Sequence, residues 1–368
     1  MTKPQHFETH QYPKTLLLAI EAPYNQTKDI NSYFEEFKNL AKANGVKIDE
    51  FFSLKIREID PTTFITKGKL EEIREICEKN EIEQIIVSEP LTVKQERNLA
   101  DFLDREVFDR TQLILEIFEK SAHTNEGKTQ VEIAMLQHRK ARVAGKGVFY
   151  GQQLGAINAK GPGETAKERE LRTLENRIHK LRQKIEQLQK TRETQRKSRL
   201  TKNIPLICLV GYTNAGKSTI LNTLTKSNVL AEDKLFATLD TTTRELYINS
   251  KKKGVISDTV GFIQMLPPNL IEAFKSTLSE LQYADLLLHV IDLSDKNWES
   301  QIRVVHEILE ELQVDTPMLY VFNKIDKVLN IQDLEYQLRK FKPNVLISAT
   351  TIEGIQPLSD YLDQWEKN

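Results

Sequence analysis

One stretch of the chain has the residue types and spacing of a phosphate-binding loop. Residues 211–218 read Gly-Tyr-Thr-Asn-Ala-Gly-Lys-Ser, which fits the pattern G-x-x-x-x-G-K-[ST]. Glycines let a backbone approach an anion closely and turn its N–H groups inward. Lys217 is expected to reach the β- and γ-phosphates, and the Ser218 hydroxyl to bind Mg²⁺. The whole loop is assigned to the nucleotide: Gly211, Tyr212, Thr213, Asn214, Ala215, Gly216, Lys217 and Ser218.

Two later segments fit the switch segments of a GTPase. Thr238 is the best candidate for a second protein ligand to Mg²⁺, and Thr241–Thr243 are its nearby rivals. Asp258 follows an apolar segment and is able to hold Mg²⁺ through water, while the Gly261 N–H is able to sense the γ-phosphate. Lys217, Thr238 and Gly261 are therefore the expected catalytic residues. The nucleotide contacts expected here are Phe236, Ala237, Thr238, Leu239, Asp240, Asp258, Thr259, Val260 and Gly261.

Phe262 stands where Ras-type GTPases place the glutamine that orients the attacking water. A phenylalanine neither donates to that water nor accepts from it. We therefore expect slow intrinsic hydrolysis, with the water positioned by another group or by a partner. Gln264 is a weak substitute for that glutamine, Arg244 is a weak candidate for an arginine finger, and no residue of the chain is assigned to the water.

A third group of residues predicts selection of guanine. In Asn323-Lys324-Ile325-Asp326, the Asp326 carboxylate is able to accept from N1–H and N2–H₂ of guanine together, whereas adenine offers an acceptor at N1. Lys324 is expected to lie along the base, and Asn323 to brace the loop. The backbone amides of Ser348-Ala349-Thr350 are expected to donate to guanine O6. An ATP-dependent enzyme is the alternative, which Asn323 and Asp326 disfavour.

These motifs follow apolar strands, which are expected at residues 206–210, 284–292, 318–322 and 345–347. Residues 203–368 are therefore expected to form a doubly wound α/β P-loop GTPase domain. Residues 1–120 also alternate strands with helices, which predicts a small N-terminal α/β domain with a parallel sheet. Thr111 is expected to cap a helix there.

The segment between these domains differs in composition. Positions 120–202 hold 20 Lys and Arg against 8 Asp and Glu, a net charge of +12, although the whole chain carries −1. Apolar residues recur at alternating spacings of three and four in the second half of the segment, which predicts a helix with a packing seam: Leu171, Leu174, Ile178, Leu181, Ile185 and Leu188. Residues 121–202 are therefore expected to form a basic antiparallel helical hairpin or coiled coil.

The hairpin loop, residues 145–163, holds 6 of the 14 glycines. One interpretation is a finger that reaches into RNA, with aromatic rings stacking on bases and cations neutralising phosphates. The alternative is a flexible linker joined to a solvated, charged coiled coil. The candidate RNA contacts are Arg142, Lys146, Phe149, Tyr150 and Lys160.

The bulk composition excludes several classes of protein. Cys77 and Cys208 lie far apart in apolar contexts, so a disulfide framework is not expected and a reducing cytoplasm is the default. No apolar run approaches about 18 residues, and the N-terminus lacks a signal sequence. We therefore expect no membrane insertion and no export.

With these motifs in place, the sequence resembles the HflX family of translational GTPases. The resemblance covers nearly the whole chain and is carried by the segments Gly68-Lys69-Leu70, 95–99, Asp109-Arg110-Thr111, 126–132, 161–165, 236–240 and 258–262, the last continuing into Leu266-Pro267. The combination of GPGET at 161–165 with FATLD at 236–240 is specific to this family among GTPases. Phe262 matches the family's hydrophobic replacement of glutamine.

The resemblance implies the same order of domains: α/β domain, helical hairpin and G domain. It also implies Mg²⁺, GTP and GDP as ligands, and binding of a monomer to the large ribosomal subunit and its rRNA, with the hairpin loop near the peptidyl-transferase region. Ribosome-stimulated hydrolysis and the splitting or rescue of stalled ribosomes in stress follow from it. The alternative is a nucleotide-gated RNA-binding module that acts in subunit maturation with little turnover.

Three departures from the family pattern limit that transfer. Thr129 stands where the family usually has leucine, and Ala166-Lys167-Glu168 replaces the usual Gln-Leu-Glu. Residues 149–160 replace a glycine cluster, so the function of the loop and its sensitivity to drugs are expected to differ. Because the sequence ends at Asn368, we do not expect the further C-terminal domain of many relatives.

Overall fold

The computed structural model describes residues 13–25, 29–145, 166–225, 235–236, 242–267, 270 and 278–367. The chain divides into two compact units, which are described separately. The first comprises Met1–Glu116 with Ala144–Tyr150, and the second comprises Ile117–Val143 with Gly151–Asn368. The division into three domains at residues 120 and 202 stays a prediction. No helix among the described residues has both the length and the hydropathy needed to cross a bilayer.

The first unit is built on a parallel sheet, as the sequence predicts. Four strands pair in the order β2-β1-β3-β4: β1 Thr15–Glu21, β2 Glu50–Lys55, β3 Gln84–Val87 and β4 Glu106–Asp109. The central β1 is an almost continuous apolar run, and its first six residues are buried, as expected for a strand covered on both faces. Three helices lie wholly within this unit's described residues: α1 Ile30–Ala43, α2 Lys67–Lys79 and α3 Val93–Leu103.

Side chains at the helix starts fix where these helices begin. The Asp29 carboxylate accepts from the backbone N–H groups of Asn31 and Ser32 at the start of α1. Thr92 and Gln95 form a reciprocal capping box at the start of α3. The expectation that Thr111 caps the next helix is wrong. Helix α4, Arg110–Ser121, already includes Thr111, and the Asp109 carboxylate accepts from the Gln112 N–H at 2.8 Å.

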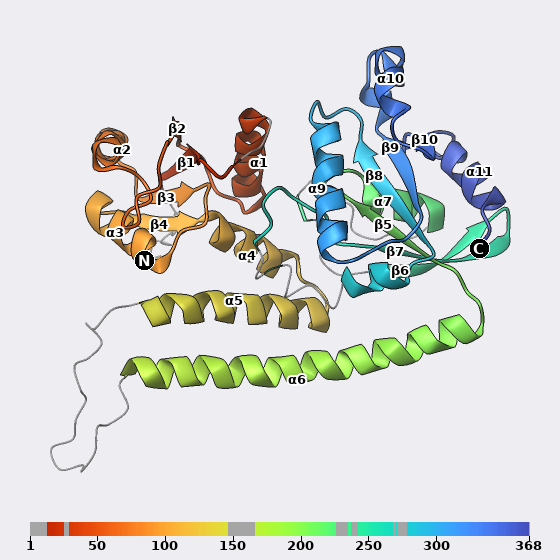
Figure 1. Ribbon diagram of the computed structural model, residues 1–368, viewed down its shortest axis with the longest axis horizontal. Helices are drawn as coiled ribbons and strands as arrows, with labels where there is room; N and C mark the ends of the chain where they lie inside the picture. The colour runs from red at the N-terminus through yellow and green to blue at the C-terminus, as the bar shows by residue number, and fades with distance from the viewer. Residues whose placement is uncertain are drawn as a thin grey trace, which may run out of the picture. The chain divides into compact units, whose positions relative to one another are not determined.

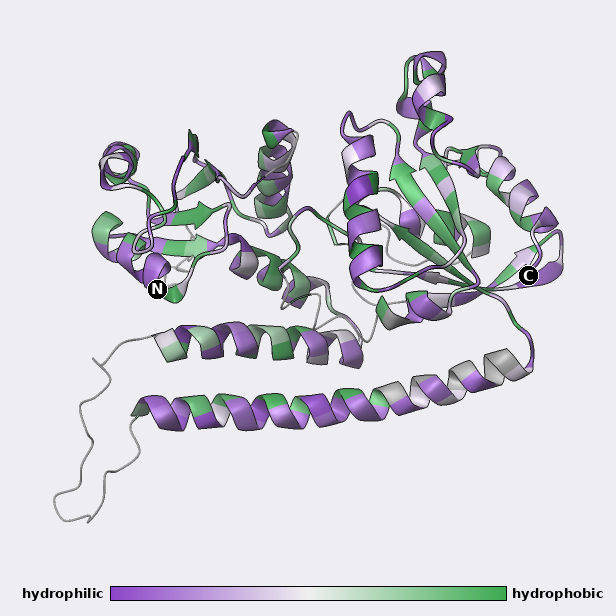
Figure 2. Ribbon diagram, viewed as in Figure 1, coloured by the Kyte–Doolittle hydropathy of each residue, from purple (hydrophilic) through white to green (hydrophobic). Residues whose placement is uncertain are grey.

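Two antiparallel helices form the expected hairpin. Helix α5, Asn125–Gly145, and the longer α6, Ala166–Thr201, lie side by side (Figure 1). Ile133 of α5 packs against Ile178 and Leu181 of α6, which are members of the predicted seam. Figure 2 shows that apolar residues of α6 lie along the side that faces α5, whereas the rest of the described helix is polar.

Ion pairs flank this apolar contact and fix the antiparallel register. Arg139 and Lys140 of α5 pair with Glu170 and Glu175 of α6, both at 2.8 Å. Nearer the start of α5, Glu132 pairs with Arg177 of α6 at 2.7 Å. These pairs are exposed or half-exposed, so the apolar seam contributes more to the stability of the hairpin than they do.

The GTPase part of the second unit is a six-stranded sheet in the order β10-β9-β8-β5-β7-β6. Five strands are parallel and β6 runs antiparallel to β7. Their bounds are β5 Leu206–Gly211, β6 Thr242–Ile248, β7 Lys251–Asp258, β8 Leu286–Asp292, β9 Met318–Asn323 and β10 Asn344–Leu346. This arrangement confirms the predicted α/β fold class.

Helices cover both faces of this sheet (Figure 1). Helix α7, Lys217–Thr225, and helix α11, Gln356–Gln364, contribute to one apolar cluster. Helix α9, Trp298–Glu311, contributes Trp298 and Ile302 to a second. Short helical turns complete the described part: η2 Ser279–Tyr283, η3 Ile325–Lys327, η4 Ile331–Leu334 and α10 Glu335–Leu338. Strand β5 lies between β7 and β8, where the strand order reverses, and this is where doubly wound sheets bind ligands.

The hairpin generates the first prediction. Substitution of Ile178 by alanine removes buried side chain from the contact with Ile133 and Leu181. We expect the free energy of local opening of the hairpin to fall by about 2–4 kcal/mol, as for other buried aliphatic truncations. Hydrogen exchange of the α5 and α6 amides measures this change. Lys180→Ala, on the exposed side of α6, is the matched control, and equal exchange in both variants would contradict the packing role.

Candidate nucleotide site

The predicted phosphate-binding loop joins β5 to α7 at the carboxyl edge of the sheet. Gly211 has φ +149°, and a Cβ there would collide with the carbonyl oxygen of Val290 on β8. Gly216 has φ +99°, and a Cβ there would collide with the side-chain amide of Asn323. Both positions therefore require glycine for conformation and for space. The loop therefore packs closely against the ends of β8 and β9.

Lys217 is the buried cation of this loop. Its side chain is 6% exposed, and its ammonium donates to the carbonyl oxygens of Tyr212 at 2.7 Å and Gly211 at 3.2 Å. Burial lowers the pKa of this ammonium to about 8, although the Asp258 carboxylate opposes the shift. The loop therefore holds a cation whose charge is poorly solvated, and a phosphate is the natural partner for it.

Two oxygen groups meet beside the loop. Asp258 lies at the end of β7 and is fully buried, and its carboxylate accepts from the Ser218 hydroxyl at 2.6 Å. A hydroxyl and a carboxylate in contact are the hard oxygen donors that Mg²⁺ prefers. The two groups therefore fit a Mg²⁺ ion. Thr238, the expected second ligand, lies outside the described residues.

The first switch segment is described only at Leu235 and Phe236. The Phe236 ring is 2% exposed and packs edge-on against Phe118, with 4.6 Å between centroids. Phe236 is therefore seated in apolar surroundings. The predicted contacts Ala237, Thr238, Leu239 and Asp240 lie outside the described residues.

The second switch segment lies against the phosphate-binding loop. A Cβ added to Gly261 would lie 2.9 Å from Thr213 Cα and 3.0 Å from Lys217 Nζ, so this glycine also has little free space. Thr259 donates its hydroxyl to the Leu209 carbonyl at 2.6 Å. The Phe262 side chain is only 1% exposed. It is thus part of the core and supplies no polar group to an attacking water.

The predicted guanine-binding residues come together at the ends of β9 and β10. Asn323 donates to the Ala215 carbonyl at 2.9 Å and accepts from the Ala349 N–H at 3.0 Å, so one amide braces two loops. Ser348 donates to Asp326 at 2.6 Å and contacts the Thr350 hydroxyl at 2.9 Å. Asp326 itself is exposed. The carboxylate is thus held from one side and remains open to a base.

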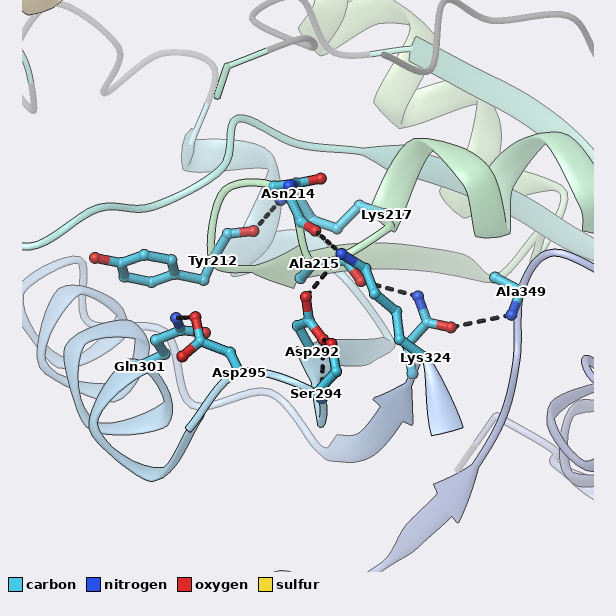
Figure 3. A network of polar contacts seen from close by, with 11 residues as sticks. Tyr212, Asn214, Ala215, Lys217, Asp292, Ser294, Asp295, Gln301, Lys324 and Ala349 are labelled. Atoms are coloured by element: carbon cyan, nitrogen blue, oxygen red, sulfur yellow. Dashed lines mark hydrogen bonds and ion pairs between the residues drawn. The ribbon is translucent and has the colours of Figure 1, made fainter. Parts of the chain in front are cut away.

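Sequence reasoning missed Asp292, which completes this arrangement. Lys324 has a left-handed backbone, φ +62°. Its ammonium donates to the Asn214 carbonyl at 2.8 Å and pairs with Asp292 at 2.7 Å (Figure 3). Both side chains of the pair are less than one-fifth exposed. The other Asp292 oxygen accepts from the backbone N–H and hydroxyl of Ser294, which fixes the carboxylate.

The signal for Asp292 was present in the sequence. An aspartate ends the strand at 284–292, at the same edge of the sheet as the motifs, but it belongs to no motif that includes Lys324.

Of the RNA candidates, only Arg142 is described, on α5 beside His138. Lys146, Phe149, Tyr150 and Lys160 lie outside the described residues. The structure adds exposed cations on α6: Arg169, Lys180, Lys184, Lys190 and Lys197.

Three family models match successive parts of the chain. A GTP-binding GTPase N-terminal model covers residues 31–119, and a GTP-binding GTPase middle-region model covers 121–199. A model described as a 50S ribosome-binding GTPase covers 206–324. The matches follow one another in the order N-terminal region, hairpin and nucleotide-binding sheet.

Curated relatives match over most of their lengths. A protein of Caldanaerobacter subterraneus named GTPase HflX is 44% identical over 85% of this chain and 72% of its own. The Escherichia coli protein of the same name is 40% identical over 93% of this chain and 80% of its own. Among solved structures, a GDP complex of a protein named SsGBP covers 95% of this chain and 98% of its own, with 28% identity and a TM-score of 0.51.

The buried Lys217 predicts a pH dependence of nucleotide binding. Bound phosphates stabilise the ammonium and raise its pKa, so binding takes up a proton once the free protein has lost it. GDP affinity should therefore decrease as the pH rises above about 8, by up to about tenfold per pH unit. Dissociation constants between pH 7.5 and 9, at constant ionic strength, test this expectation.

The Lys217→Ala variant is the control for the pH series. It should bind GDP more weakly, and its affinity should depend less on pH. Any pH dependence that remains in this variant reports titration of the guanine base of GDP. Parallel profiles for the two proteins would exclude Lys217 as the titrating group.

The Asp292 contact predicts a loss of affinity for guanine nucleotides. Asp292→Ala frees the Lys324 ammonium from one of its two anchors. We expect the GDP dissociation constant to rise about tenfold, or roughly 1.4 kcal/mol. Asp295→Ala is the matched control, because Asp295 lies in the loop that follows Asp292 but binds Gln301 at 2.7 Å (Figure 3). Equal losses in both variants would indicate general damage to the loop.

Proposed function

The chain belongs to the GTPase HflX family, and we propose that it hydrolyses GTP on the large ribosomal subunit and there splits or rescues stalled ribosomes. Its relatives are named GTPase, and the chain, like them, is an enzyme that hydrolyses GTP. The ribosomal partner is supported by the family model matched at 206–324, described as a 50S ribosome-binding GTPase. This proposal places the protein in the cytoplasm, as a monomer that acts on ribosomes.

The observation that carries the proposal is a basic hairpin attached to a guanine-nucleotide site. Residues 120–202 carry a net charge of +12, and α6 exposes lysines along much of its length, including Lys180, Lys184 and Lys190. A surface of this kind is attracted to the phosphates of RNA. The large subunit offers such phosphates at high density, so the hairpin is the part proposed to dock there.

Residues of the nucleotide site have proposed roles in this reaction. Ser218 and Thr238 would hold Mg²⁺, with Asp258 as a further oxygen group, and a bound ion would supply positive charge opposite the phosphates. Lys217 stabilises the transition state, and the Gly261 N–H binds the γ-phosphate. Asp326 and Asn323 select guanine, while Lys324 lies along the base.

The cycle of binding and release follows from these roles. The γ-phosphate of GTP contacts Thr238 of the first switch segment and Gly261 of the second, which raises affinity for the subunit. Hydrolysis removes the γ-phosphate, so these contacts are lost and the protein leaves. Because Phe262 is buried and apolar, the chain lacks the usual group that orients water. Stimulation by the ribosome is therefore part of the proposal.

A second candidate function rests on the same phenylalanine. A protein that hydrolyses GTP only slowly is suited to act as a nucleotide-gated RNA-binding module in subunit maturation. In that case the nucleotide state controls binding, and turnover contributes little. Both functions use the same nucleotide site and the same basic hairpin, so the rate of hydrolysis on the ribosome decides between them.

GTP turnover with and without purified large subunits tests the proposal. We expect stimulation of at least about tenfold and a GTP-dependent loss of 70S particles in a sucrose gradient. Deletion of residues 147–160 should remove the stimulation while leaving the basal rate unchanged. The variant Lys180→Gln, Lys184→Gln, Lys190→Gln should weaken binding to the subunit.

An equally charged control separates a specific surface from a general effect of charge. Lys251, Lys340 and Lys342 are exposed lysines of the GTPase part, and their replacement by glutamine should leave stimulation intact. Subunit binding without faster turnover would favour the maturation module. Absence of any binding to the subunit would remove both functions.

A further inference from the structure

The segment that carries Gly261 is joined to the phosphate-binding loop by hydrogen bonds between their backbones. Strands β5 and β7 pair in parallel up to Leu209 and Asp258. Beyond the ends of these strands, an isolated parallel bridge joins Tyr212 to Phe262. The switch segment therefore continues the sheet instead of leaving it at Asp258.

Two backbone hydrogen bonds make up this bridge. The Phe262 N–H donates to the Gly211 carbonyl at 3.1 Å, and the Thr213 N–H donates to the Phe262 carbonyl at 2.9 Å. Gly261 precedes Phe262, and it is close to Lys217 Nζ and Thr213. The position of Gly261 beside the buried ammonium thus depends on how firmly residue 262 and its neighbours are held.

A side chain of the loop adds a third attachment. The Tyr212 hydroxyl accepts from the backbone N–H of Gln264 at 2.8 Å, across 52 positions in the sequence. Tyr212 is 6% exposed and Gln264 is 4% exposed, so solvent does not compete with this bond. In Figure 3 the Tyr212 ring extends away from Lys217, while its carbonyl faces the ammonium.

We propose that the Tyr212 hydroxyl is a positioning group for GTP hydrolysis, which fixes the second switch segment so that Gly261 stays beside Lys217. The phenolic oxygen holds the segment two residues beyond the bridge, and the bridge holds it one residue beyond Gly261. With attachments on both sides of Ile263, the segment has little freedom to move away from the loop.

The effect of this attachment is selective among nucleotides. Gly261 is placed to meet the γ-phosphate, which GTP has and GDP lacks. Loosening the switch segment therefore weakens contacts made to GTP and to the transition state. Contacts to the α- and β-phosphates are expected from the loop itself. Loss of the Tyr212 hydroxyl leaves the Tyr212 carbonyl, which accepts from Lys217, in place. The proposal rests on GTPase activity alone and is independent of the ribosomal partner.

Tyr212→Phe is the direct test, because it removes one oxygen and keeps the buried ring. We expect the rate constant for hydrolysis of bound GTP, measured in single-turnover reactions, to fall about tenfold, the size typical of a lost supporting contact. Affinity for a non-hydrolysable GTP analogue should fall by a similar factor. Affinity for GDP should change less than about twofold. Fluorescent nucleotide titrations measure both affinities.

Tyr247→Phe is the matched control. Tyr247 is exposed and bonds to Glu245 at 2.9 Å on β6, so its variant should retain every nucleotide parameter of the wild type. Melting temperature and GDP affinity report the state of the fold in both variants. The proposal is overturned if the single-turnover rate constant of Tyr212→Phe stays within about twofold of the wild-type value. It is also overturned if affinities for GDP and the GTP analogue fall in parallel, since that result indicates structural damage alone.

Discussion

The close approach of backbone to backbone at the carboxyl edge of the six-stranded sheet is the constraint on which the rest depends. At Gly211 and Gly216 a single added carbon would collide with β8 and with the Asn323 amide. Without side chains at these positions, the loop after β5 lies directly on its neighbours. A phosphate site needs N–H groups and an ammonium at short range, and a backbone packed in this way brings them together.

The same closeness explains the electrostatics of the site. Lys217 lies under the loop and is bonded to two carbonyl oxygens, which carry only partial charge. Its pKa falls because burial penalises the charged form more than the nearby Asp258 supports it. An anionic ligand beside Lys217 would favour its charged form. Asp292 and Lys324 show the opposite arrangement, since each charge there has a direct partner.

The nucleotide site and the basic hairpin are built in different ways. The nucleotide site is built from strand ends, which are rigid and buried. The hairpin is built from two long helices, stabilised by a narrow apolar seam and covered with exposed charge. Rigidity suits selection among small ligands, because polar groups must be held in place. An exposed basic helix suits an extended polyanion, because long-range attraction needs little shape complementarity.

The sequence by itself determined the fold class and the segments that carry the chemistry. The α/β alternation, the parallel sheet of the first unit, and the seam containing Ile178 and Leu181 follow from local periodicity, which short windows of sequence encode. The expected N-cap of α4 lies two positions too late, at Thr111 instead of Asp109, because both residue types are good capping residues.

Only the tertiary structure decided which distant groups meet. Asp292 reaches Lys324, and the Tyr212 hydroxyl reaches the Gln264 N–H, although neither pair shares a motif. The low pKa of Lys217 likewise depends on burial that no local pattern states. The order of the strands fixes such contacts, and that order results from packing over the whole sheet, so no local stretch of sequence specifies it.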